Sequence, residues 1–387
     1  MTPKKTPLSI YIHFPWCERK CPYCDFATRT SLRDGIPQQA FSEAIVSELR
    51  WRSATLKDYE LISIFIGGGT PSLWQPEHVA QVLSQIKCNL DVTSSKLEVT
   101  LEGNPNSLSA EAFEAYLQAG INRFSIGVQS LDAEQLRFLG RLHNSEQALK
   151  VVQAARKLTR RVSADLILAV AGQTEQSIQK DLQTLLSLGL EHLSAYTLTI
   201  EPNTTFGSMH RKGKLVLAHE DSYAEIFLRT QKTLKDAGFE HYEVSNYAKA
   251  GQRSIHNAHY WQGGEYLGLG PAAVGALFQD NKRKRRYRNH PDPALYMKLC
   301  HSAKLEQERE ELEANDLIRE GIMLGLRTQE GLALEPLESS TGQSVLLGRE
   351  AAAEKQLGRG NLCISASHWR IPDTRWLHLD SIITDLF

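Results

Sequence analysis

The feature that most constrains the fold of this chain is a repeated alternation along its first half. Short apolar runs rich in β-branched side chains alternate with longer segments in which apolar residues recur at helical spacing. The predicted strands cover residues 8–14, 61–66, 97–101, 123–128, 162–168 and 192–200, and the predicted helices between them cover residues 39–51, 76–86, 110–119, 145–157 and 174–188. This order predicts an α/β fold whose parallel sheet is either a partial (β/α)6 barrel or an open, doubly wound sheet.

The second half of the chain departs from this alternation. A helix is predicted over residues 221–237, followed by an extended segment at 242–247 and an irregular Gly-rich stretch at 263–275. Helices at 314–326, 349–356 and 374–386, with a hairpin around Leu362 and Trp369, predict a mostly helical, winged-helix-like appendage. The predicted domains are a core over 1–240, an extension over 241–298 and a C-terminal domain over 299–387.

Charge and cysteine usage limit the classes of function. Lys and Arg total 44 against 45 for Asp and Glu, so the formal charge of -1 gives no global attraction to nucleic acid, and no nucleic-acid partner is expected. The one dense basic run, at 282–288, is predicted as a solvated loop, with contact to ligand carboxylates or anionic lipid headgroups as the alternative. The chain shows neither an export signal nor a membrane span, so we expect a cytoplasmic protein with reduced cysteines.

Three of the six cysteines form a tight motif directly after the first predicted strand. Cys17, Cys21 and Cys24 have the spacing C-x3-C-x2-C, whereas the remaining three are isolated and are predicted to be structural thiols. Three thiolates on one loop can bind three irons of a 4Fe-4S cluster and leave the fourth iron open. The alternative is a zinc site with His13 as fourth ligand, but no second ligand pair is present.

The segment Cys17-Glu-Arg-Lys-Cys21-Pro-Tyr23-Cys24 resembles the cysteine motif of the radical S-adenosylmethionine superfamily. The resemblance implies a partial six-stranded βα barrel and an open iron that binds the amino and carboxylate groups of S-adenosylmethionine. It also implies that the glycines of Ile66-Gly-Gly-Gly-Thr-Pro-Ser72 lie beside the methionyl amino group.

Polar residues stand at the ends of successive predicted strands, where parallel sheets and barrels collect ligands. They are Glu102 and Asn104 at the end of the third strand and Gln129 at the end of the fourth, with Asp165 within the fifth, and we expect Arg141 and His143 to join them. Within the superfamily these landmarks are similar to those of the oxygen-independent coproporphyrinogen III oxidase group. That resemblance implies a cofactor site lined by Tyr11, Tyr23, Gly68, Gly69, Thr70, Glu102, Gln129, Arg141 and Asp165.

The chain departs from the oxidase of this group in two places, because Phe26 stands where the oxidase has a further cysteine and the long N-terminal segment is missing. Ala169-Val-Ala-Gly172 also replaces a usual Gly-Leu-Pro-Gly, and the segment from Gly268 to Val274 lacks a histidine that relatives carry.

The segment His256-Asn-Ala-His259-Tyr260-Trp261 resembles the H-N-x-x-Y-W motif of heme chaperones in this group. A histidine beside aromatic rings can ligate heme iron. His256 is therefore the predicted heme ligand, and His259 could replace or supplement it. The resemblance implies delivery of heme to acceptor proteins, including respiratory ones at the membrane, where the chain could lie peripherally. The rival hypotheses are radical decarboxylation of coproporphyrinogen III and, more remotely, a radical enzyme that modifies nucleic acid.

Overall fold

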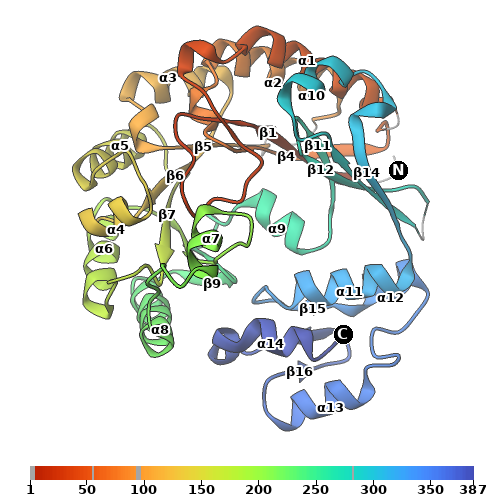
Figure 1. Cartoon of the computed structure of the whole chain (residues 1–387). Helices are drawn as coiled ribbons and strands as arrows, with labels where there is room; N and C mark the ends of the chain where they lie inside the picture. Colours follow the sequence, from red (N-terminus) through yellow and green to blue (C-terminus); the bar gives the residue numbers. More distant parts are fainter. Residues whose placement is uncertain (1–4, 55, 93–96, 281–282) are drawn as a thin grey trace.

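The computed structural model describes residues 5–54, 56–92, 97–280 and 283–387, and its largest element is one mixed sheet (Figure 1). The strand order is β14-β13-β12-β11-β1-β4-β5-β6-β7-β8-β10-β9. These strands are β1 (Thr6–Phe14), β4 (Tyr59–Gly68), β5 (Glu98–Gly103), β6 (Arg123–Gln129), β7 (Val162–Leu168), β8 (His192–Thr197), β9 (Glu240–Glu243), β10 (Asn246–Ala248), β11 (Glu265–Leu269), β12 (Val274–Phe278), β13 (Lys284–Asn289) and β14 (Glu306–Leu312).

The predicted βα units form the centre of this sheet. Strands β1 and β4 to β8 are parallel neighbours in chain order, and the connecting helices lie along the outer side of the curved sheet (Figure 1). These helices are α1 (Gln38–Ser53), α2 (Pro76–Asn89), α3 (Ala110–Ala119), α4 (Ala133–Phe138), α5 (Ser145–Leu158), α6 (Glu175–Ser187) and α8 (Glu220–Asp236). The predicted α/β fold is therefore confirmed, and the alternation located each of the six strands.

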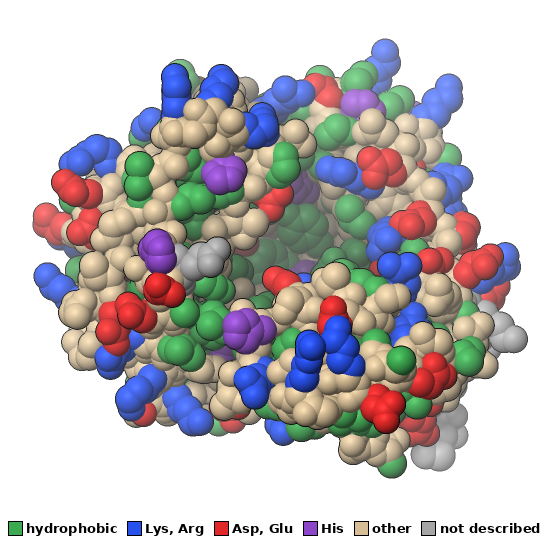
Figure 2. Space-filling view, turned by 60° about the horizontal axis from the view of Figure 1, so that its bottom comes forward, with side chains coloured by type: hydrophobic (Ala, Val, Ile, Leu, Met, Phe, Trp, Pro, Cys, Tyr) green, Lys and Arg blue, Asp and Glu red, His purple; other side chains and the backbone are tan. Residues whose placement is uncertain are grey.

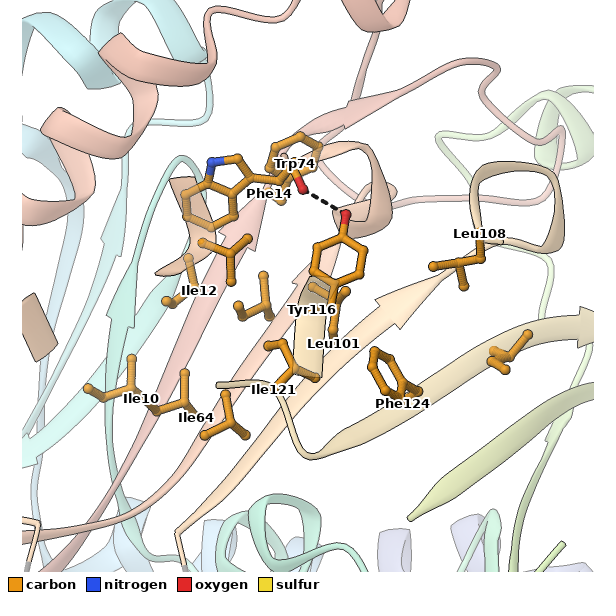
Figure 3. Close-up of a cluster of buried hydrophobic side chains, with 14 of the residues drawn as sticks. Ile10, Ile12, Phe14, Ile64, Trp74, Leu101, Leu108, Tyr116, Ile121 and Phe124 are labelled. Carbon is orange, nitrogen blue, oxygen red and sulfur yellow. Dashed lines mark hydrogen bonds between the residues drawn. The ribbon is translucent and has the colours of Figure 1, made fainter. Parts of the chain in front are cut away.

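The core lies between the parallel strands and the outer helices. Ile10, Ile64 and Leu101 come from neighbouring strands and are buried together (Figure 3). The Tyr116 hydroxyl of α3 donates a hydrogen bond of 2.7 Å to the carbonyl of Trp74, so a buried polar group is satisfied inside the cluster. Strands covered on both faces are nearly continuous in apolar residues, which is why the sequence revealed them so clearly.

The prediction of an irregular Gly-rich stretch at 263–275 was wrong. Strand β11 pairs in parallel with β1, and β12 follows it antiparallel. A Cβ on Gly268 would stand 2.1 Å from the carbonyl oxygen of Val274, and one on Gly275 would stand 2.3 Å from the Tyr287 ring. These glycines serve close approach inside a sheet, which composition alone does not distinguish from a loop.

The prediction of a solvated basic loop at 282–288 was also wrong. This holds for residues 283–288, because Lys282 lies outside the described residues. Strand β13 pairs antiparallel with β14, so that Arg286 stands opposite Glu310 and Arg288 opposite Glu308. The basic run is matched by an acidic strand far along the chain, and opposite charges on paired strands stabilise each other.

The C-terminal part forms a smaller unit with its own hydrophobic cluster around Trp369 and Trp376. It contains α11 (Ala314–Gly325), α12 (Leu334–Thr341), α13 (Glu350–Gly358), α14 (Leu379–Thr384) and a small sheet of β15 (Leu332–Ala333), β16 (Cys363–Ile364) and β17 (His368–Arg370). The helix predicted at 374–386 is split, because a 3-10 segment covers Asp373–His378. The domain boundaries at 240 and 298 stay a prediction.

Candidate functional site

The cysteine motif lies on a loop that is closed at its base by two short strands. Strands β2 (Trp16–Cys17) and β3 (Arg29–Thr30) pair in parallel on either side of it. Within the loop the Cys24 N–H donates to the Cys21 carbonyl at 3.2 Å, and the Pro22 carbonyl accepts from the Phe206 N–H of α7 (Thr205–Arg211) at 2.8 Å. The loop is thus fixed to a distant segment of the chain.

A cavity of about 390 Å³ opens beside this loop at the ends of the parallel strands. The predicted residues that line it are Cys17, Cys21, Tyr23, Cys24, Gly68, Gly69, Thr70, Glu102, Gln129, Arg141 and Asp165. Figure 2 shows the face of the molecule that is hollowed at its centre, with hydrophobic side chains inside the hollow. The parallel topology therefore gathers residues from β4, β5, β6 and β7 with the cysteines, as the positions at strand ends predicted.

The glycines at the end of β4 are required by close packing against the first strand and the cysteine loop. Gly68 has φ +107°, and a Cβ there would lie 2.6 Å from the His13 ring. A Cβ on Gly69 would lie 2.5 Å from the carbonyl oxygen of Trp16. The Gly69 N–H donates to the Phe14 carbonyl at 2.7 Å. Larger residues would push the cysteine loop away from the strand ends.

Two partly buried carboxyl groups, those of Glu102 and Asp165, line the cavity. Burial, and then the carboxylate of Asp165, raises the pKa of Glu102 to about 8. Burial also raises the pKa of Asp165, although hydrogen bonds from Ser194 and Ser125 oppose this. The Ser125 hydroxyl lies 3.0 and 2.9 Å from the two Asp165 carboxylate oxygens. Near neutral pH, Glu102 can therefore act as a hydrogen-bond donor or acceptor.

Arg141 lines the cavity next to the cysteine loop. One terminal nitrogen donates to the Cys21 sulfur at 3.5 Å, and the other donates to the Gly127 carbonyl at 3.1 Å and to Asn104. Its buried Nε has no hydrogen-bond partner among the described residues. A cation with a free donor next to three thiols suits an anionic group in the cavity.

Backbone strain occurs at the same place, because Gln129 at the end of β6 has φ +67°. A non-glycine residue in this region costs of order 1–3 kcal/mol, and such residues cluster at ligand sites. A strained backbone, two partly buried carboxyl groups and an arginine with an unpartnered donor thus lie around one cavity.

Several predicted residues lie outside this lining. Tyr11 bonds to His13 Nδ1 at 3.0 Å, and His13 Nε2 bonds to the Ala27 carbonyl at 3.0 Å. Both ring nitrogens of His13 are engaged, which leaves neither of them free to bind zinc. His143 Nε2 lies 3.0 Å from the Val128 carbonyl and is buried beneath the site.

The predicted heme ligand is buried against the sheet. His256 lies in α9 (Ile255–Trp261), its Nδ1 is 3.0 Å from the Ser63 hydroxyl, and its ring centroid is 5.0 Å from that of Phe65. His259 Nε2 contacts the Glu265 carbonyl at 3.0 Å. Tyr260 is half-exposed and packs on Tyr266. Neither histidine lines the cysteine cavity.

Sequence reasoning missed the contribution of the sixth parallel strand. Tyr196 and Thr197 at the end of β8, with Glu201 beyond it, line the cavity. Their position at a strand end was the same signal that identified Glu102 and Gln129. Among the described residues, no group of three or more His, Cys, Asp or Glu is arranged to hold one metal ion. Thiolates that bind different irons of a cluster need not converge on one point.

Comparison with known proteins gives the family. Residues 11–185 match the family model of the radical SAM superfamily, and residues 312–377 match that of the HemN C-terminal domain. Heme chaperone HemW of Haemophilus influenzae is 35% identical over 390 residues, which cover 98% of this chain and 98% of the relative. The chain belongs to the HemW family.

Other HemW family relatives match along nearly the same length. HemW of Escherichia coli is 35% identical over 381 residues, covering 98% of each chain. The mouse mitochondrial protein described as radical S-adenosyl methionine domain-containing protein 1 is 34% identical, covering 98% of this chain and 87% of the relative. Among solved structures, the coproporphyrinogen III oxidase HemN of Escherichia coli superposes with a TM-score of 0.82 at 18% identity, covering 99% of this chain and 90% of that chain. That likeness supports the fold and not the activity.

Proposed function

We propose that this protein is a heme chaperone that carries a 4Fe-4S cluster, binds S-adenosylmethionine and heme, and passes the heme to acceptor proteins. The observation that carries the proposal is the similarity to HemW from two organisms, at 35% identity over 98% of this chain. The match extends through the C-terminal part, so it is not limited to the region shared by radical SAM proteins of other functions.

The residues around the first cavity fit the proposed cluster and cofactor. Cys17, Cys21 and Cys24 would hold three irons, and the cluster would supply an iron with an open coordination position. Arg141 offers an unpartnered donor for a carboxylate, and the Glu102 and Asp165 carboxyl groups can bind amino or hydroxyl groups. Gln129 would be held in its strained conformation by the neighbouring strands.

Both histidines that the sequence predicts as heme ligands have hydrogen-bond partners inside the fold. The Nδ1 of His256 is hydrogen-bonded to Ser63 and its ring packs against that of Phe65, so coordination by His256 requires heme to reach its other nitrogen inside the fold. Its role as heme ligand stays a prediction, as does that of His259.

The second candidate function is oxygen-independent oxidation of coproporphyrinogen III, which the fold likeness to HemN favours. Phe26 argues against it, because the position at which the oxidase carries a further cysteine holds an apolar side chain that is 55% exposed. No helix among the described residues is long and apolar enough to cross a membrane. Delivery to respiratory acceptors at the membrane, with peripheral contact, stays a prediction.

Heme transfer tests the proposal. Anaerobically reconstituted protein would be loaded with one equivalent of heme and mixed with the heme-free form of a b-type cytochrome. We expect the absorption spectrum of the holocytochrome to appear faster than in a control in which serum albumin carries the heme. Absence of heme binding at micromolar concentration would contradict the proposed function.

A further inference from the structure

A second cavity, of about 580 Å³, lies between the sheet-forming part of the chain and the C-terminal part. Its walls come from the end of α9, from β12 and β13, and from α11, α12 and β17. Helices α9 and α11 contact each other at this junction (Figure 1). The cavity shares no lining residue with the first one, and its volume falls within the ~300–1,000 Å³ of typical ligand sites.

Aromatic side chains give this cavity an apolar wall. Trp261, the last residue of α9, lines it together with Phe278 of β12. The H-N-x-x-Y-W segment therefore contributes its tryptophan to the cavity, whereas His256 at its start is buried elsewhere on Ser63 and Phe65. Large flat rings bury much apolar surface against a planar ligand.

A histidine that the sequence did not single out lines the same cavity from the other side. His368 lies on β17, is exposed, and has its Nδ1 3.0 Å from the Ser367 hydroxyl. Engagement of Nδ1 leaves Nε2 as the coordinating atom, which is the usual arrangement of a metal-binding imidazole. Unlike His256, His368 needs no rearrangement of the core to meet a ligand.

An arginine and a buried glutamate lie on the wall of this cavity. Arg253 pairs with Glu240 and Glu330, whose side chains are 48% and 52% exposed. Exposed ion pairs are worth about 0–1 kcal/mol, so a ligand carboxylate can replace one of these partners at little cost. Glu243 is buried, and its Oε1 has no hydrogen-bond partner among the described residues. Burial raises the pKa of Glu243 to about 7, although hydrogen bonds from Asn246, Ser245 and Trp261 oppose this. Near neutral pH this carboxyl group is therefore partly protonated, which weakens its repulsion of a ligand carboxylate.

We propose that this second cavity is where the chain holds heme, with His368 Nε2 as an iron ligand, Trp261 packed on the porphyrin and Arg253 paired with a propionate. The inference rests on the proposed heme chaperone function and adds to it a location and a ligand.

Paired variants test the location in the full-length, cluster-reconstituted protein by heme titration and Soret spectroscopy. His368→Ala removes the proposed ligand, and His378→Ala removes an exposed histidine of the same C-terminal part as its control. Ser340→Trp fills the cavity from α12, and Ser339→Trp places the same ring on the neighbouring exposed position. Far-ultraviolet circular dichroism and iron content establish that each variant is folded and loaded.

We expect His368→Ala to shift the Soret maximum and to weaken heme binding at least about tenfold, and Ser340→Trp to weaken it similarly. Both controls should behave as the wild type. If wild-type protein binds heme and the His368→Ala and Ser340→Trp variants keep its affinity and spectrum, the proposed location is wrong while the chaperone function stands. Loss of the Soret shift in His256→Ala alone would likewise overturn the assignment of His368. Failure of the wild type to bind heme would instead remove the proposed function itself.

Discussion

Glu98 accepts a hydrogen bond of 3.0 Å from the backbone N–H of His256, 158 residues further along the chain. The same carboxylate accepts from the N–H of Ile255 at 3.1 Å and forms an ion pair with Arg161. Arg161 in turn donates to the Arg253 carbonyl at 3.1 Å. The start of β5 thereby fixes both the beginning of α9 and the segment that leads into it, which places Trp261 on the second cavity.

Replacement of Glu98 by Ala should be strongly destabilising. It removes the partner of a largely buried cation and the acceptor for two helix N–H groups, so we expect a loss of about 2–4 kcal/mol in the free energy of unfolding. Urea denaturation of the variant measures this loss. Glu146→Ala, which breaks the exposed ion pair with Lys150, is the control and should leave the midpoint unchanged. An equally small effect of Glu98→Ala would contradict the role assigned to it.

The three clustered cysteines, and not the other three, should be needed for binding of the 4Fe-4S cluster. The triple variant Cys17→Ala, Cys21→Ala, Cys24→Ala should bind no 4Fe-4S cluster after anaerobic reconstitution, because each thiol is needed for one iron. The triple variant of Cys88, Cys300 and Cys363 to Ala should keep it. Iron analysis and electron paramagnetic resonance of the reduced protein report both results. A full cluster in the first variant would exclude the site.

Ala169 should be a point of stored strain. It follows β7 with φ +60°, at the position where the related Gly-Leu-Pro-Gly segment begins with glycine. The left-handed conformation costs a residue with a Cβ about 1–2 kcal/mol, and replacement by glycine removes this cost. Glycine also has greater freedom in the unfolded chain, which offsets part of the gain in stability. We expect Ala169→Gly to raise the free energy of unfolding by about 0.5–1 kcal/mol in thermal or urea denaturation. A destabilised variant would show that the backbone there is not strained.

The parallel strands and their polar ends could be predicted from the sequence because both depend on local patterns. Apolar runs marked β1 and β4 to β8, and their parallel order gathered Glu102, Gln129 and Asp165 around one cavity. Strand β13 could not be found in this way, since its basic residues are paired with glutamates of β14 about two dozen residues later. The orientation of His256 was likewise hidden, because Glu98 and Ser63, far away in the sequence, determine it.

Glu102 should make the stability of the cofactor-free protein depend on pH. Its pKa is raised from 4.5 to about 8 in the folded state, so the folded chain holds this proton more tightly than the unfolded chain. The wild type should therefore lose stability as the pH rises from about 4.5 to about 8. Glu102→Gln abolishes this titration, and we expect it to be more stable than the wild type by up to about 5 kcal/mol at pH 9 and equal to it near pH 4. Parallel urea titrations at the two pH values would refute the assignment if the difference did not change.

As a heme chaperone, the chain should bind heme and should not transform a porphyrinogen. The most direct measurement divides one anaerobically reconstituted preparation between a heme titration and an incubation with coproporphyrinogen III, S-adenosylmethionine and a reductant. Products of the incubation are separated by chromatography, with HemN of Escherichia coli as the positive control. We expect one equivalent of heme to bind and no decarboxylated product to form. Conversion of coproporphyrinogen III at a rate comparable to that of HemN, without heme binding, would mean that the protein is an oxidase and not a heme chaperone.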